Sequence, residues 1–156
     1  MAYIPAILIG VLRTGVGPVD SASRPVRRRY RRAMARWRDG TGTLTITDRD
    51  GVTETRVPLR IAASYRRRAR GLLGRDGVDG ALMITPCGSV HSFGMRFTID
   101  VAYLDRRFNV LAIHTMRPGR LGLPRLRGRH VIEAEAGAMA AWGLRPGMQV
   151  RVTPAR

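Results

Sequence analysis

Lysine is absent from this chain, so all 28 strongly basic side chains are arginines; with 11 acidic residues, the formal net charge is +17. A guanidinium stays charged at physiological pH and binds phosphate or carboxylate through two parallel hydrogen bonds. Coding bias in a GC-rich genome is the simpler explanation for the missing lysine, but an exchange of lysine for arginine conserves charge. We therefore expect the surface to attract polyanions such as nucleic acid or an acidic membrane.

Cysteine occurs once, at position 87. One cysteine excludes an intrachain disulfide and any zinc site that needs two or more cysteine ligands from one chain. A lone thiol is typical of a reducing cytoplasm. We predict no metal site and no cofactor from this composition.

Long hydrophobic runs are also missing. The apolar run Tyr3–Leu12 has ten residues, whereas a membrane-spanning helix needs about 20. No basic residue precedes this run, as it would in a signal peptide, so export is less favoured. We expect a cytoplasmic protein without an integral membrane segment.

The first forty residues predict a basic, disordered extension, followed by one compact domain over residues 41–156. Eight arginines lie between residues 24 and 38. They suit an arm that binds phosphates, a solvated tail, or a mis-called start upstream of Met34. The anion-binding candidates of this arm are Arg27, Arg28, Arg29, Arg31 and Arg32.

Alternation and turn residues predict an α+β fold. A hairpin is expected from Leu44–Thr47 and Val52–Ile61, joined by the turn-prone Asp48–Gly51. We expect a small, mostly antiparallel, partly closed, barrel-like sheet with two short helices. The expected helices are Ala62–Leu73 and Ala136–Trp142, and the further strands are Ala81–Ile84, Phe97–Leu104, Val110–Ile113, His130–Glu135 and Met148–Val152.

Four segments resemble the family called domain of unknown function 192, which groups uncharacterised bacterial and archaeal proteins. They read RARGLLGR (68–75), PCGSVHSFGMRFTIDVAYLD (86–105), VIEAEAGAMAAWGL (131–144) and RPGMQVRV (145–152). The resemblance covers residues 55–153. It implies a compact, barrel-like α+β domain and no established activity, and we expect a bacterial protein.

Asp100 lies within an apolar strand, where a buried carboxylate needs a partner. Arg75 and Arg96 are the candidate partners. Together with His91 and Met95 they suggest a pocket for a small polar or anionic ligand. The alternative is a structural ion pair that fixes the sheet to its loops.

His91 and Cys87 raise the possibility of nucleophilic catalysis, which requires the two side chains to be in contact. In an extended segment, four residues span about 13 Å, which argues against a local dyad. Glu133 and Glu135 share a strand face, where they form either an acid–base pair or cross-strand pairs with arginines.

These observations favour a non-enzymatic accessory domain that binds a small ligand. One alternative is binding to nucleic acid or an acidic surface, through the arginine-rich arm and the basic loop Met116–Arg129. That loop contributes Arg120, Arg125 and Arg127. A second alternative is a hydrolase that uses His91.

Overall fold

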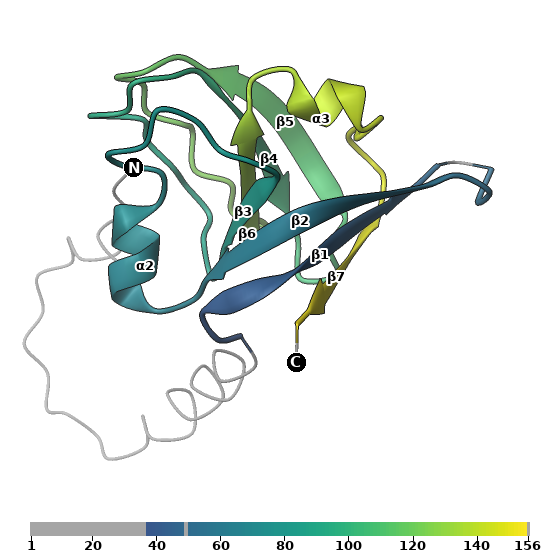
Figure 1. The fold of residues 1–156 in the computed structure, drawn as a ribbon. Helices are drawn as coiled ribbons and strands as arrows, with labels where there is room; N and C mark the ends of the chain where they lie inside the picture. Colours follow the sequence, from purple (N-terminus) through teal and green to yellow (C-terminus); the bar gives the residue numbers. More distant parts are fainter. Residues whose placement is uncertain (1–36, 49, 156) are drawn as a thin grey trace, which may run out of the picture.

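The computed structural model describes residues 37–48 and 50–155, so most of the arginine-rich arm lies outside the described residues. Within them the chain forms one mixed sheet with the strand order β5-β4-β6-β3-β2-β1-β7 and two short helices (Figure 1). The elements are β1 (Gly40–Thr47), β2 (Glu54–Ala62), α2 (Tyr65–Arg70), β3 (Ala81–Ile84), β4 (Ile99–Leu104), β5 (Val110–Met116), β6 (His130–Glu135), α3 (Ala138–Ala141) and β7 (Val150–Pro154).

The predicted hairpin forms a long antiparallel strand pair within the sheet. β1 and β2 pair antiparallel with Leu44 opposite Val57, and β7 pairs with the other edge of β1. The next pairing, between β2 and β3, is parallel, while β3, β6, β4 and β5 pair antiparallel with their neighbours. The expected α+β architecture with two short helices is therefore confirmed, although the sheet is mixed.

The barrel-like closure is not confirmed. β5 and β7 are the two outer strands of the sheet. In the described part of the chain they meet at an isolated bridge between Asn109 and Gln149, next to a backbone hydrogen bond of 3.1 Å from Val150 N to Phe108 O. The sheet is thus open, with its two edges touching at one end.

Two hydrophobic layers cover the two faces of the sheet, because successive strand residues point to opposite sides. The first layer takes side chains from all seven strands, such as Leu44 and Ile132, and it is covered by Met139 of α3. The second layer takes alternate residues of the central strands, such as Val101 and Val131, and it is covered by Leu72 and by the loops between strands. The central strands β3, β6 and β4 are therefore buried on both faces.

Helix α2 is shorter than the predicted Ala62–Leu73 segment. Ala62 continues β2, and Ser64 caps the helix by accepting a 3.4 Å hydrogen bond from Arg67 N. Gly71, with φ of 48°, ends it. In this helix Tyr65 is exposed, whereas Arg68 is buried.

The N-terminal boundary of the packed structure includes residues assigned to the arm. Trp37 packs edge-on against Phe108 with ring centroids 5.6 Å apart, and it belongs to the margin of the first hydrophobic layer. Asp39 accepts hydrogen bonds of 2.7 and 2.8 Å from the backbone N–H groups of Ala63 and Ser64. These contacts attach the start of β1 to the turn before α2.

Gly80, immediately before β3, offers a direct test of this packing. Its φ is 69°, and a Cβ there would collide with the carbonyl oxygen of Pro58. We expect Gly80→Ala to lower the free energy of unfolding by about 2 kcal/mol, from left-handed strain and the backbone clash. The measurement is urea unfolding. Gly77→Ala is the matched control, because its Cβ would meet nothing within 4 Å, and equal losses in both variants would contradict the prediction.

Candidate functional site

The five residues of the predicted pocket are not brought together. Asp100 lies on β4 facing the first hydrophobic layer, and its Oδ2 accepts hydrogen bonds of 2.9 Å from Gly137 N and 3.3 Å from Met139 N. Its Oδ1 accepts a 2.8 Å bond from the Thr115 hydroxyl. The carboxylate therefore holds the start of α3 against the sheet, in place of the expected ion pair with an arginine.

Arg96 pairs elsewhere. Its guanidinium forms a 2.8 Å ion pair with Asp76, and both side chains are mostly exposed. Met95 is buried in the second hydrophobic layer, across the sheet from Asp100. The predicted partnership of Arg96 with Asp100 is wrong. Arg96 is exposed and paired with Asp76, whereas Asp100 is buried and bonded to the start of α3.

His91 is buried in the loop that covers the second layer. Its ring packs against Phe93 with centroids 5.0 Å apart, and its Nδ1 lies 3.4 Å from Phe93 N. Burial lowers the pKa of His91, which favours a neutral ring. Cys87 is also buried, but its Sγ donates a 3.1 Å hydrogen bond to Ser89 O. These contacts give His91 and Cys87 separate partners.

A buried carboxyl lies in the same layer. Glu133 of β6 is completely buried, and neither of its side-chain oxygens has a hydrogen-bond partner in the described part of the chain. Its cross-strand neighbours are Leu82 and Val101, so the predicted pairing with arginines is wrong. Burial raises the pKa of Glu133 to about 8, which keeps the group neutral at pH 7.

Cys87 and Tyr103 lie within electrostatic range of Glu133. Burial raises the pKa of the Cys87 thiol to about 12 and that of the Tyr103 phenol to about 12. The protonated thiol is a poor nucleophile, because thiol reactivity requires the thiolate. This layer is therefore poorly suited to cysteine catalysis.

An open groove of about 370 Å³ is bordered by β1, β2 and the segment before β3, and it contains Arg75. Half-buried Arg60 lines the same groove, together with Asp79. Burial lowers the pKa of Arg60, and the charge of Arg75 lowers it further. The remaining lining residues are Thr41, Gly42, Pro58 and Leu59. We call this feature the Arg60–Arg75 groove.

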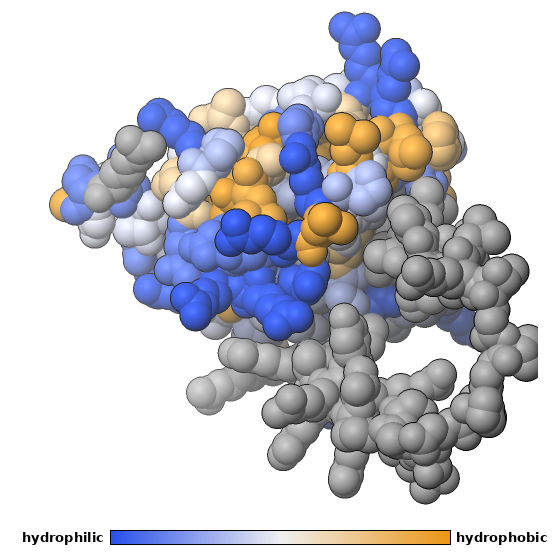
Figure 2. Space-filling model, turned by 180° about the vertical axis from the view of Figure 1, so that it is seen from behind, coloured by the Kyte–Doolittle hydropathy of each residue, from blue (hydrophilic) through white to orange (hydrophobic). Residues whose placement is uncertain are grey.

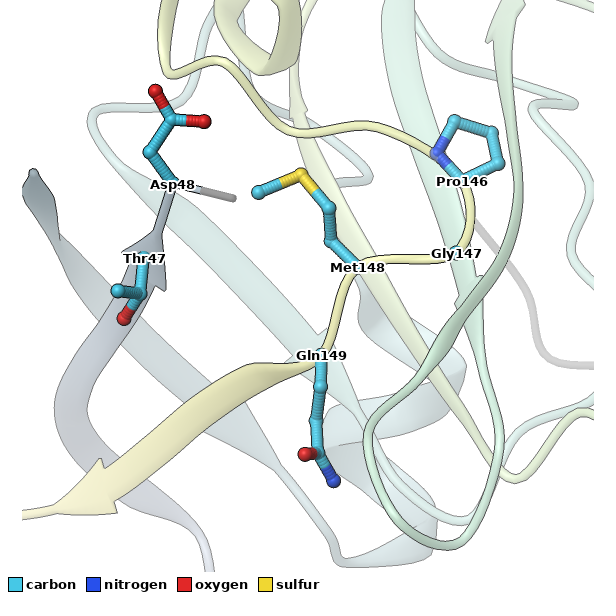
Figure 3. Close-up of a pocket in the computed structure, with 6 residues that line it drawn as sticks. All are labelled: Thr47, Asp48, Pro146, Gly147, Met148 and Gln149. Carbon is cyan, nitrogen blue, oxygen red and sulfur yellow. The ribbon is translucent and has the colours of Figure 1, made fainter. Parts of the chain in front are cut away.

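Another pocket, of about 260 Å³, lies between the end of β1 and the segment that leads into β7. Figure 3 shows Met148 extending toward Asp48 across it, while the side chain of Gln149 points away. Thr47, Pro146 and Gly147 complete its lining. It has fewer charged side chains than the Arg60–Arg75 groove, so it is less suited to an anion.

The arginines of the basic loop fall into two groups. Arg120 and Arg127 are exposed, whereas Arg125 is half-buried and its Nη2 lies 2.7 Å from Nε2 of His114. The guanidinium of Arg125 also lies 5.7 Å from the centre of the Tyr103 ring. Arg125 therefore holds the loop to the sheet, and Arg120 and Arg127 remain open to a partner.

Within residues 37–48 and 50–155, no group of three or more His, Cys, Asp or Glu side chains is placed to hold a metal ion. No helix in the same residues is both long enough and apolar enough to cross a bilayer.

Together these features define a small α+β domain on an open mixed sheet, with a two-arginine groove and a buried neutral acid. The chain belongs to the DUF192 family (Uncharacterized ACR), whose model matches residues 45–152. It is 36% identical over 84 residues to UPF0127 protein PH1112 of Pyrococcus horikoshii, a match that covers 51% of this chain and 73% of that protein. The family resemblance is thus confirmed. This relative is archaeal, and the bacterial origin of the chain itself stays a prediction.

Solved structures agree on the fold. A protein of unknown function from Novosphingobium aromaticivorans covers 76% of this chain and 96% of its own, with a TM-score of 0.63 and 18% identity. A protein from Sinorhizobium meliloti, described as a candidate transcription regulator, covers 74% of this chain and 96% of its own, with a TM-score of 0.64 and 15% identity. At these identities the likeness shows the fold alone.

Sequence reasoning missed Arg60, Asp79 and the burial of Glu133. Arg60 lies between Leu59 and Ile61 in an alternating strand. This alternation predicts that the Arg60 side chain is on the polar face, but it does not predict that Arg75 is nearby. Its nearness to Arg75 depends on the turn after α2, which no periodicity encodes. The burial of Glu133 has no local signal, because nothing in the neighbouring residues marks β6 as a central strand.

Proposed function

We propose that this domain is a non-enzymatic binding module whose ligand is a small anion held in the Arg60–Arg75 groove. The observation that carries the proposal is that two arginines, Arg60 and Arg75, line one groove of about 370 Å³. Like charges placed together are unfavourable until an anion lies between them. The lowered pKa of Arg60, caused by burial and then by Arg75, supports this arrangement.

The chemistry of the groove limits the ligand. Each guanidinium offers a planar pair of donors that matches a carboxylate or phosphate. Asp79 offsets one of the two positive charges, which favours a ligand of low charge over a polyphosphate. The volume is near the lower limit of about 300 Å³ for small-molecule pockets. A short-chain carboxylate or a phosphate monoester fits these constraints.

The alternative of a hydrolase has less support. His91 rests against Phe93, and the Cys87 thiol donates to Ser89 O with its pKa raised to about 12. A Cys–His nucleophile requires the two groups in contact and the thiol ionised. Binding without covalent chemistry is therefore the function that this geometry favours.

Titration of the full chain with inorganic phosphate and with citrate tests the proposal. We expect saturable binding, with amide NMR shifts at Gly42, Leu59 and Asp79. Arg60→Gln and Arg75→Gln should each weaken binding about tenfold, the cost of one charge-assisted hydrogen-bonding partner. Arg56→Gln removes an exposed arginine from the same strand and should leave the affinity unchanged.

Two outcomes would contradict the proposal. Equal weakening by Arg56→Gln would mean that phosphate senses only the net charge. Unchanged affinity in both groove variants would place the anion elsewhere. Because Arg75 is exposed and Arg60 half-buried, both variants should fold, and their circular dichroism spectra provide the check.

A further inference from the structure

One surface combines exposed apolar side chains with arginines. Of the six large hydrophobic residues that are exposed in the described part of the chain, four lie here: Phe93 at 50%, Leu121 at 57%, Leu123 at 75% and Leu126 at 93%. Seen from behind the view of Figure 1, the protein indeed carries hydrophobic patches directly beside strongly hydrophilic ones (Figure 2). Exposed apolar residues that gather in one region indicate an interaction site.

The residues come from two loops that are bonded to each other. Gly122 N donates a 2.8 Å hydrogen bond to Val90 O, and Ser92 N donates one of 2.8 Å to Arg120 O. The Ser92 hydroxyl also donates a 2.6 Å bond to Arg117 O. These bonds fix both loops as one surface, so the leucines are held outward by an anchored backbone.

The charged side chains of the basic loop all have one sign. Arg117, Arg120 and Arg127 are exposed on it, and no acidic residue occurs between Asp105 and Glu133. We define the leucine–arginine face as Phe93, Leu121, Leu123 and Leu126 with these three arginines. An acidic partner therefore meets no repulsion from the residues of this loop.

We propose that the leucine–arginine face docks on an anionic lipid bilayer, with the leucines entering the interfacial region and the arginines binding lipid phosphates. Membrane-surface proteins combine these two contributions, because apolar burial and attraction to anionic lipid add. Nucleic acid uses only half of the surface. Its phosphates would bind the arginines, but leucines exposed by 75% and 93% would gain little against a sugar–phosphate backbone.

Insertion can be read directly from a fluorophore on the face. An environment-sensitive dye attached to Leu126→Cys in the full chain should shift to the blue and brighten with vesicles of phosphatidylcholine and phosphatidylglycerol. Cys87 is buried, so it should not take up the dye. The same dye on Val52→Cys, an exposed position in the β1–β2 turn, should not change. An unchanged signal at position 126 on bound vesicles would overturn the proposal.

Two multiple variants separate the contributions in a vesicle sedimentation assay. Replacing Leu121, Leu123 and Leu126 by serine should weaken partitioning about 30-fold or more through lost apolar burial. Replacing Arg117, Arg120 and Arg127 by glutamine should weaken it about 100-fold, at about fivefold for each arginine. Arg56, Arg66 and Arg151, all exposed, give a glutamine control with the same net charge.

The outcomes discriminate the partner. Loss of vesicle binding in the serine variant, with the arginine control near wild type, supports a lipid surface. Equal losses in the two arginine variants, or full vesicle binding by the serine variant, would mean that net charge alone explains the binding. Either result would overturn the proposal. Binding to a duplex oligonucleotide without binding to the vesicles would overturn it in favour of nucleic acid. Failure of the phosphate titration at the Arg60–Arg75 groove would not affect any of these results.

Discussion

Replacing Glu133 by glutamine should make the protein more stable than the wild type at pH 9 while leaving it similar at pH 5. Burial raises the pKa of this carboxyl from 4.5 to about 8. Between these two values the unfolded chain releases the proton and the folded chain keeps it. The free energy of unfolding of the wild type therefore falls as the pH rises through this window, and it changes no further above about pH 8.

The expected size of the effect follows from the same two values. Between pH 5 and pH 9 the difference in unfolding free energy between variant and wild type should grow by about 4 kcal/mol, at 1.36 kcal/mol for each pH unit below the folded pKa. Urea unfolding at pH 5, 7 and 9 measures it. Comparing the two proteins also cancels the titration of His130, whose pKa burial lowers to about 4.

Glu135→Gln is the matched control. Glu135 is the next acid on β6, and it is exposed. Its curve of stability against pH should run parallel to that of the wild type. If the Glu133→Gln curve also runs parallel to that of the wild type, then Glu133 is already ionised or already paired in the folded protein. The prediction that Glu133 is buried in its neutral form would then be wrong.

Strand alternation predicted most of the sheet because alternation directly reports which face is buried. It located the β1–β2 hairpin and the bounds of β6. Alternation does not report burial where a strand has no solvent face. β6 lies between β4 and β3, so both of its faces are covered and Glu133 is buried.

The predicted site shows a second limit. Asp100 was correctly expected to need partners, because a buried carboxylate cannot remain without hydrogen bonds at low cost. The sequence did not show that backbone N–H groups from a segment 37 and 39 residues away would supply them. The sequence offered only arginine side chains, those of Arg75 and Arg96, as partners. The free N–H groups at the start of a helix can be assigned as donors only when the fold shows where that helix lies.

Replacing Asp100 by alanine should be among the most damaging single changes in this protein. The carboxylate accepts from Gly137 N, Met139 N and the Thr115 hydroxyl in a site that is 4% exposed. Alanine would leave these donors without their acceptor, including the buried N–H of Met139, and would remove the bonds that hold the start of α3 to the sheet. We expect a loss of about 3 kcal/mol or more in the free energy of unfolding, measured with urea at pH 7.

Asparagine at the same position should be far milder, which separates hydrogen bonding from packing. Its amide oxygen can accept from the two backbone N–H groups, while its NH₂ donates to the Thr115 hydroxyl, which can reverse its role. The expected loss is about 1 kcal/mol. Asp76→Ala is the control, because it removes an exposed carboxylate paired with Arg96 and should cost under about 1 kcal/mol. If Asp100→Ala costs no more than Asp76→Ala, then Asp100 does not hold α3 to the sheet.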